Sequence, residues 1–340
     1  MRLLNELRCA LALALIFSVV WPALSWFAFR RQPPRVSPPT NVDRDSSGNT
    51  TAILIVTDLA GQRIYARTIA SMRAYADHQR YALVVWDPWS DHPINRIECQ
   101  GFKHLFFRRH CVARFLLLRE YTTLAAVDAD VAVVDFQRRI EDLFRTPRQS
   151  VVHEERFHNG EVHAGAYVVR RGAFADAYLQ RWSEMETRLP YAGFNNGDNG
   201  ALHLHLLNTL YGANSPQAAR CGALWDVSSN LDTYDAYVGC AMSYLFNATT
   251  PDIRLVRRGH GFCRDLWVTE SQTTAGVDMW VHGIKERDPM PGVSASIDAM
   301  RPVMALADAK ARRERPRSLL APARIDHCWP LCPEYWDAIT

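Results

Sequence analysis

Short apolar runs alternate with stretches of helical periodicity over much of the chain. The runs are continuous, end in polar residues and have the length of buried strands, at Ala52–Val56, Tyr81–Trp86 and Leu124–Val127. Apolar residues at helical spacing fill the intervals up to about Ala76 and over Arg109–Arg119. Strands and helices in this order are typical of an α/β protein with a mostly parallel sheet and helices on both faces.

The alternation continues further along the chain and then weakens. Gly165–Val169 predicts another strand, and Ala173–Glu186 and Asn199–Leu210 predict helices, the second with a leucine stripe. Beyond that helix the pattern is less periodic and richer in Gly, Pro and Cys. One folded body is therefore placed over residues 51–293, followed by a Cys- and Pro-containing extension over 294–340.

The strongest compartment signal lies at the N-terminus, where Cys9–Phe29 contains no charged residue. As a helix with a rise of about 1.5 Å per residue, this run would span roughly 30 Å, the thickness of a hydrocarbon core. The alternative is a signal peptide cleaved before Trp26, which would make the protein secreted. We expect a cytoplasmic tail over residues 1–8, a transmembrane signal anchor over 9–29 and a proline-rich stem over 30–50.

Glycosylation and cysteine signals favour a body in the lumen of the secretory pathway. Two N-x-S/T sequons, at Asn49 and Asn247, can be used only in that compartment. Seven of the eight cysteines follow the apolar run, so up to three disulfides and one free thiol are expected, with a cluster at Cys328 and Cys332. These signals predict a single-pass type II protein of the Golgi or ER membrane.

The composition narrows the function classes only slightly. Apolar residues make up 48% and charged residues 22% of the 340-residue chain, which leaves ample material for a core. A net charge of +3 is too small to indicate a nucleic-acid partner. We interpret the basic run Lys310–Arg317 as a solvated helix face.

Two carboxylates stand one residue apart directly after the apolar run Leu124–Val127. Asp128 and Asp130 would emerge at the carboxyl end of a buried strand, where ligands bind in open α/β sheets. Hard divalent cations are held by one or two carboxylates while substrate phosphates complete the shell. We expect these two residues to bind Mn²⁺ or Mg²⁺ and, through the cation, a diphosphate.

Five segments occur in a characteristic order along the chain: Ser71–Gln79, Arg109–Val112, Asp128–Asp130, Ala164–Val169 and Asp198–His203. Together they resemble glycosyltransferases of the GT-A (Rossmann-like) fold, most closely a nematode-rich family of nucleotide-diphospho-sugar transferases and more distantly the glycogenin-like enzymes. The resemblance implies a GT-A catalytic domain over 51–293. It also implies a metal-dependent, hexosyltransferase-like enzyme that moves a sugar from a nucleotide-diphosphate donor to a hydroxyl of a glycan, glycoprotein or glycolipid.

The same resemblance implies roles for particular side chains. Asp198 would lie near the reacting sugar, either as a base or as a stabiliser of a developing cation, and it could also cap a helix. Arg109 would contact the donor, with Arg108 and Arg114 as rivals for that role.

A late segment, Trp280–Lys285, is similar to the His-Gly-Lys element that closes such donor sites. Its spacing departs from the H-x-x-G-x-x-K form of the glycogenin-like enzymes. His282 would be a third metal ligand, Gly283 would let the backbone approach a phosphate, and Lys285 would place a cation on the leaving diphosphate.

Residues after the first strand are candidates for contact with the nucleoside of the donor. Thr57 and Asp58 end that strand, and Tyr65 follows on the next helix. Tyr65 would either stack on the base or belong to the core.

Two other function classes fit parts of the sequence. Haloacid-dehalogenase-like phosphatases also place D-x-D after an apolar strand, but their motif continues with x-[TV], where this chain has Ala132. The other alternative is an inactive, membrane-tethered sugar-binding or scaffold protein of the same fold. The sequence opposes it only by retaining five candidate side chains together: Asp128, Asp130, Asp198, His282 and Lys285.

Overall fold

The computed structural model describes residues 50–265 and 278–284, apart from 157, 158, 192, 247, 249 and 259. The expected anchor, the stem up to residue 49, the asparagines of both sequons, Lys285 and the extension over 294–340 lie outside the described residues. Among the helices that are described, none combines the length and the apolar character needed to cross a bilayer.

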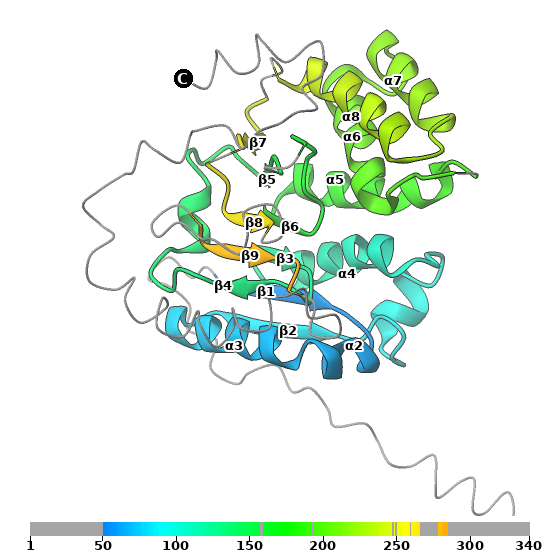
Figure 1. The fold of residues 1–340 in the computed structure, drawn as a ribbon. Coiled ribbons are helices and arrows are strands. Elements are labelled where there is room, and N and C mark those ends of the chain that lie inside the picture. Colours follow the sequence, from blue (N-terminus) through cyan, green and yellow to red (C-terminus); the bar gives the residue numbers. More distant parts are fainter. Residues whose placement is uncertain are drawn as a thin grey trace, which may run out of the picture. The chain divides into compact units, whose positions relative to one another are not determined.

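The centre of the fold is a six-stranded sheet (Figure 1). Its spatial order is β2 (Ala82–Trp86), β1 (Thr51–Val56), β3 (Thr123–Val127), β6 (Ala166–Arg170), β5 (Val151–Glu154) and β7 (Ile253–Val256). β1 pairs in parallel with β2 and β3, and β5 pairs in parallel with β7. β6 is antiparallel to both of its neighbours, so it alone reverses the direction of this sheet. The mostly parallel sheet is therefore confirmed, and the reversed strand is a feature that the alternation pattern did not predict.

Both faces of the sheet are covered, as expected, because alternate residues of each strand point to opposite sides. Ala52 and Leu54 of β1 face one apolar cluster, which the larger group of helices completes. Ile53 and Ile55 face a second cluster, which includes residues of α3 and of a small second sheet. The helices of the first face are α4 (Leu105–Arg119), α5 (Ala173–Glu184), α6 (Gly197–Tyr211), α7 (Pro216–Asp226) and α8 (Leu231–Leu245). Figure 1 shows α6, α7 and α8 grouped beside α5.

The second sheet has the order β4-β9-β8 and contains three very short strands. These are β4 (Ala132–Val133), β9 (Trp280–His282) and β8 (Cys263–Asp265). β4 follows β3 almost at once, so this sheet brings a late part of the chain to the end of β3.

Several helix boundaries in the structure differ from those that the periodicity predicts. The first helical stretch is two helices, α2 (Leu59–Ile64) and α3 (Ala66–Gln79), which meet at Tyr65. The helix expected from Arg109 begins at Leu105, and the one expected to end at Glu186 ends in a short 3₁₀ turn, η3 (Met185–Arg188). A short π-helical segment, η1 (Ile94–Glu98), and a second 3₁₀ turn, η2 (Ile140–Leu143), complete the described elements.

The region after Leu210 is more regular than its sequence pattern indicates, because it forms α7 and α8. Local signals for both helix starts are present in the sequence. Ser215 caps α7 by accepting from the Ala218 amide at 3.2 Å, with Pro216 in the first turn. Asn230 caps α8 through a capping box with Thr233.

Two of the expected disulfides lie within the described part of the chain. Cys99 is bonded to Cys111 and Cys221 to Cys240, so one bridge ties η1 to α4 and the other ties α7 to α8. Cys263 is buried and unpaired. The remaining C-terminal cysteines lie outside the described residues.

Candidate active site

The candidate site lies where β3 ends. The last residue of β3, Val127, is followed by a tight turn in which the Val131 amide donates to the Asp128 carbonyl at 3.2 Å. The Asp128 amide donates to the Gly165 carbonyl at 2.8 Å, which ties the turn to the start of β6. Asp130 is 4% exposed, whereas Asp128 is half-buried. The strand end therefore fixes two carboxylates one residue apart.

The small second sheet brings His282 to these carboxylates. β9 pairs with β4 immediately after the turn, and the Ile284 amide donates to the Asp130 carbonyl at 3.1 Å. The Nε2 atom of His282 lies 3.6 Å from Asp128 Oδ2 and 3.5 Å from Asp130 Oδ1. The predicted trio of metal ligands is thus assembled from segments about 150 residues apart.

A fourth residue, Asp265, orients the His282 ring. Asp265 stands opposite His282 in the β8–β9 pairing, and its Oδ1 lies 2.8 Å from His282 Nδ1. Arg156 donates two hydrogen bonds of 2.8 Å to the Asp265 carboxylate. Metal-binding histidines commonly donate their second ring nitrogen to a carboxylate in this way. The pair leaves Nε2 of His282 directed at Asp128 and Asp130.

The charges around His282 dominate its protonation. Burial lowers the pKa of the His282 imidazole, but Asp130, Asp128 and Asp265 raise it, with a net pKa of about 10. Burial raises the pKa of Asp265, and hydrogen bonds from His282 and Arg156 overcome this and hold it well below its usual range. Without a cation, the imidazolium supplies the positive charge that the carboxylates require.

The residues at this strand end fit a divalent cation. Two carboxylates and an imidazole supply the oxygen and nitrogen ligands that such cations take in proteins. The absence of a side chain at Gly165 keeps space beside them, because a Cβ there would lie 2.4 Å from Asp128 Oδ2 and 2.7 Å from His163 Nε2. The His163 Nε2 atom is buried and has no hydrogen-bond partner among the described residues.

Arg109 connects the candidate cation site at Asp128 and Asp130 to Asp198. Arg109 is 2% exposed on α4, forms an ion pair with Asp128 Oδ1, and donates to Asp198 Oδ2 at 2.6 Å and to the Ala164 carbonyl at 3.0 Å. Burial lowers its pKa, but Asp128 and Asp198 raise it more. Burial raises the pKa of Asp128, but Arg109, His282 and His163 together lower it more, so it is held well below its usual range.

The geometry also separates Arg109 from its two sequence rivals. Arg108 donates to the Asn95 carbonyl at 3.0 Å, and Arg114 pairs with Asp176 at 2.5 Å. Neither makes a contact with Asp128 in the hydrogen bonds and ion pairs of the described residues, and only Arg109 of the three faces the candidate site.

Asp198 lies inside the first turn of α6 and is not its cap. Asn196 occupies the cap position, with no hydrogen bond from its side chain to the helix amides. The Oδ2 atom of Asp198 also lies 3.2 Å from His110 Nε2, and His110 Nδ1 lies 2.9 Å from the Tyr167 hydroxyl. Burial lowers the pKa of His110 to about 4, so its imidazole is neutral and donates to Asp198. Arg109 and His110 together fix the orientation of this carboxylate.

The residues predicted to meet the nucleoside lie at the neighbouring end of β1. Asp58 accepts from the Gly61 amide at 2.6 Å and caps α2, which gives it a structural role. Thr57 is buried, with Gly61 against it. Tyr65 is half-buried at the α2–α3 junction and packs against the second apolar cluster. Contact between these side chains and a nucleoside stays a prediction.

Gly283 follows β9 with φ of +95°, a conformation that residues with a side chain rarely adopt. The turn that it makes returns the chain to the Asp130 carbonyl through the Ile284 amide. Lys285, the other predicted member of this segment, lies outside the described residues.

The sequence interpretation missed several residues that the fold adds to the site. These are Glu154, Arg156, His163, Asp265 and, behind Asp198, His110. His163 and His110 stand within or beside segments that carry the family resemblance, which is a usable signal. Asp265 belongs to no motif, and only the β8–β9 pairing places it at His282.

Comparison with solved structures returns glycosyltransferases at low identity. A glycosyltransferase involved in glycosylation of the major capsid of PBCV-1 is 12% identical, with 74% of this chain and 99% of that chain covered and a TM-score of 0.42. The glycosyltransferase GlyE of Streptococcus pneumoniae TIGR4 is 11% identical, with 76% and 63% covered and a TM-score of 0.38. Mouse xyloside xylosyltransferase 1 is 9% identical, with 72% and 99% covered and a TM-score of 0.32.

A search of curated proteins gave no match. One family model matches residues 72–297, and its description is "Protein of unknown function, DUF273". The match includes the Asp128–Asp130 turn, Asp198 and His282. Since it spans more than half of the sequence, the chain belongs to the DUF273 family.

Proposed function

We propose that the protein is a cation-dependent glycosyltransferase that moves a sugar from a nucleotide-diphosphate donor to a hydroxyl acceptor. The observation that carries the proposal is the convergence of Asp128, Asp130 and His282 at the carboxyl end of β3. Ligands of open α/β sheets bind at this end of the strands. The arrangement suits a substrate whose diphosphate shares a cation with the protein.

Each residue of the site has a task in this proposal. A bound Mn²⁺ or Mg²⁺ would act as a Lewis acid that neutralises the diphosphate as it leaves. Asp128, Asp130 and His282 would hold that ion, and Gly165 would leave room for the donor beside Asp128. Gly283 would let the backbone approach the diphosphate. The nucleoside would be bordered by Thr57, Asp58 and Tyr65, as the sequence interpretation predicts.

Asp198 would face the sugar during transfer. In the reaction the acceptor oxygen bonds to the anomeric carbon, the bond from that carbon to the diphosphate oxygen breaks, and the hydroxyl proton is released. Positive charge develops on the sugar ring as the diphosphate departs, and a fixed carboxylate stabilises it. Arg109 and His110 already occupy Oδ2 of Asp198, so they hold this charge in place. Because Arg109 is paired with Asp128, which would hold the cation beside the diphosphate, Arg109 would also lie close enough to contact the donor.

The secretory pathway is the proposed location, with a glycan, glycoprotein or glycolipid as acceptor and the N-terminal apolar run as membrane anchor. Two disulfides in the described residues agree with an oxidising compartment. A shift of the protein's electrophoretic mobility on treatment with an N-glycosidase, absent in an Asn49→Gln, Asn247→Gln double variant, would be the expected result. Unchanged mobility, with the protein accessible to protease in intact vesicles, would contradict this location.

The function is tested by replacing one of the cation ligands. Asp130→Asn removes a negative oxygen ligand with little change in shape, and we expect release of nucleoside diphosphate from sugar nucleotides to fall at least about 100-fold. Asp77→Asn on α3 is the matched control, because Asp77 is exposed and lies outside the site. Turnover is measured with a panel of sugar nucleotides and added Mn²⁺, and folding is checked by thermal unfolding.

Two outcomes would refute the proposal. One is full turnover by a well-folded Asp130→Asn variant. The other is a wild-type protein whose affinity for every sugar nucleotide is independent of Mn²⁺ and Mg²⁺. Donor binding that depends on the cation but gives no turnover with any acceptor would indicate the inactive sugar-binding alternative.

A further inference from the structure

His163 is a buried histidine next to the candidate cation site. It follows β5 in a segment that leads back to β6, and it is 1% exposed. Its backbone amide donates to the Glu154 carbonyl at 2.9 Å. Its Nδ1 atom lies 3.4 Å from Glu154 Oε1, at the long end of the hydrogen-bonding range.

Glu154 is itself held in place by the backbone. Its Oε2 accepts from the Phe262 amide at 2.5 Å and from the Cys263 amide at 2.9 Å. A carboxylate fixed by two donors on one oxygen has its other oxygen available to accept from His163. Burial raises the pKa of Glu154 to about 8, so the carboxylate and the carboxylic acid are both accessible near neutral pH. A cation at His163 Nε2 selects the carboxylate and the tautomer with the proton on Nδ1, which leaves the lone pair on Nε2.

The Nε2 atom of His163 points toward the cation ligands and finds no partner among the described residues. It borders the same small space beside Gly165 as Asp128 Oδ2. The His163 ring also meets the His282 ring edge to face, with centroids 4.7 Å apart. Ligand atoms of His163, Asp265 and His282 all lie within 4.8 Å of one another, as do those of Asp128, Asp130 and His282, so His282 is the residue that the two groups share.

His163 therefore repeats the arrangement of His282. Each ring is oriented by a buried carboxylate at Nδ1, Asp265 for one and Glu154 for the other, and each presents Nε2 to the end of β3. This is the usual setting of histidines that bind metal ions. His153 and His205 also have a buried ring nitrogen without a partner among the described residues, but neither belongs to a group of side chains there that could hold a metal ion.

We propose that His163 is a second imidazole ligand of the cation site, and that the site therefore takes a first-row transition cation such as Mn²⁺ in preference to Mg²⁺. This inference rests on the proposed function for the presence of a cation. An unpaired buried nitrogen costs free energy, and a bound ion removes that cost. Imidazole suits transition cations, whereas Mg²⁺ favours oxygen ligands and retains its waters.

The test counts the imidazoles on bound Mn²⁺ in the purified full-length protein. Pulsed electron paramagnetic resonance detects the ¹⁴N nuclei of ligating histidines, and titration calorimetry gives the affinities for Mn²⁺ and Mg²⁺. We expect two coupled imidazoles in the wild type and one in His163→Gln. We also expect His163→Gln to weaken Mn²⁺ binding about 10- to 100-fold and Mg²⁺ binding much less.

The controls separate this inference from the proposed function. His205→Gln on α6 removes another buried histidine with an unpartnered ring nitrogen among the described residues, and it should leave both the imidazole count and the Mn²⁺ affinity unchanged. A single imidazole in the wild type, lost in His282→Gln, would overturn the role of His163 and leave the proposed function intact. A wild type that binds no Mn²⁺ would overturn both. If His163→Gln does not fold, the counts in the wild type and in His282→Gln still decide, with two and one expected.

Discussion

One buried guanidinium holds together the two halves of the candidate site. Asp128 belongs to the cation ligands and Asp198 to the start of α6, and Arg109 is bonded to both. Two carboxylates in this interior would repel each other without a shared positive charge. Arg109 therefore sets the separation between the place where the diphosphate would leave and the place where the sugar would react.

Arg109→Lys tests this bridging role. Lysine keeps the charge but is a single point donor, so it cannot serve two carboxylates and a carbonyl with the planar fork of arginine. We expect a loss of about 1–3 kcal/mol in the free energy of unfolding and a fall of about 100-fold in kcat/KM. Urea denaturation and sugar-nucleotide turnover measure the two effects.

Arg114→Lys is the matched control on the same helix. Its pair with Asp176 is partly exposed, and such pairs contribute under about 1 kcal/mol. If Arg114→Lys lowered turnover as much as Arg109→Lys does, the bridge between Asp128 and Asp198 would not explain the effect.

Among the elements, the entry to α6 decides where Asp198 points. Asn196 and Gly197 have φ values of +53° and +57°, so the backbone turns sharply before the helix begins. The side chain of Asn195 accepts from the Gly197 amide at 2.9 Å, and that of Asn196 donates to Glu161 Oε1 at 2.8 Å. These two hydrogen bonds hold the turn in place, and the turn therefore sets the direction in which the first residues of α6 point.

Gly200 and Gly222 give a matched pair of helical glycines for testing this element. A Cβ at Gly200 in α6 would lie 2.1 Å from the Asn195 carbonyl oxygen and 2.9 Å from Trp225 Nε1. We expect Gly200→Ala to lower the free energy of unfolding by about 1–3 kcal/mol and to reduce kcat, because the turn before Asp198 has to move.

Gly222 in α7 has no atom closer than 3.6 Å to the added Cβ. Gly222→Ala should therefore leave turnover unchanged and raise the free energy of unfolding by up to about 1 kcal/mol, since alanine is the better helix former. Equal effects of the two substitutions in urea denaturation and turnover assays would contradict the steric argument.

The same elements show what the sequence could and could not predict. The apolar run before Asp128 and Asp130 is local and continuous, so strand β3 and its polar end were predictable. β4, β8 and β9 have two or three residues each, too few for any periodicity, and they exist only because they pair with one another. Asp265 and His163 could therefore not be placed at the site from sequence, whereas the caps of α7 and α8 were readable signals that apolar periodicity overlooked.

At the scale of the whole molecule, five of the histidines that the structure describes are almost fully buried. His110, His153, His163, His203 and His205 are each at most 1% exposed. Burial lowers the pKa of all of them, to about 4 for His110 and about 3 for His153. Between these values and about 6.5, the ordinary histidine pKa, the unfolded chain binds more protons than the folded chain. Their contribution to stability is full above pH 6.5 and is lost as the pH falls.

His282 acts in the opposite direction in the absence of a cation. Its pKa is raised to about 10, so its contribution is full below pH 6.5 and is lost as the pH rises toward 10. The two groups of histidines together favour the folded state near neutral pH. Acid should therefore destabilise the protein well before its ordinary carboxylates are protonated.

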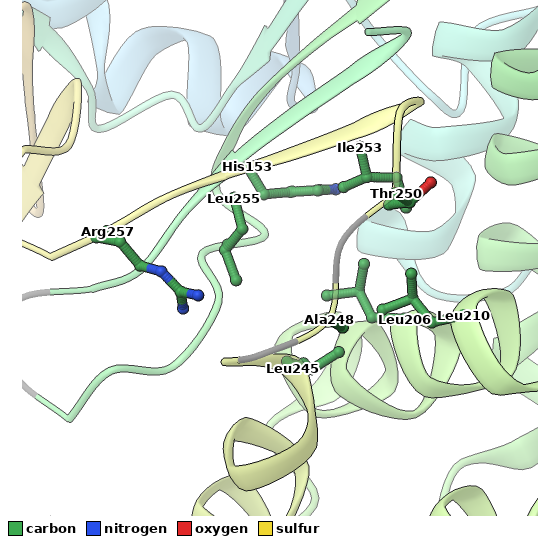
Figure 2. Close-up of a pocket in the computed structure, with 9 residues that line it drawn as sticks. All are labelled: His153, Leu206, Leu210, Leu245, Ala248, Thr250, Ile253, Leu255 and Arg257. Atoms are coloured by element: carbon green, nitrogen blue, oxygen red, sulfur yellow. The ribbon is translucent and has the colours of Figure 1, made fainter. Parts of the chain in front are cut away.

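His153→Gln tests how much one of these histidines contributes to the pH dependence of stability. His153 is not among the candidate cation ligands, and it lies on β5 in the wall of a cavity of about 90 Å³ that Leu206, Leu245 and Ile253 also line (Figure 2). Its Nε2 lies 2.8 Å from the Tyr178 hydroxyl, a contact that a glutamine amide can replace. Each buried neutral histidine costs the folded state about 1.4 kcal/mol per pH unit below pH 6.5.

The variant should therefore be less sensitive to acid than the wild type. Between pH 8 and pH 5 the free energy of unfolding of His153→Gln should fall by about 2 kcal/mol less than that of the wild type. Urea denaturation at both pH values measures this, and the difference at pH 8 accounts for any change in packing, because His153 is neutral in both states there. Parallel losses in the two proteins would mean that His153 is protonated as readily in the folded chain as in the unfolded one, and that burial around the cavity does not exclude the charge.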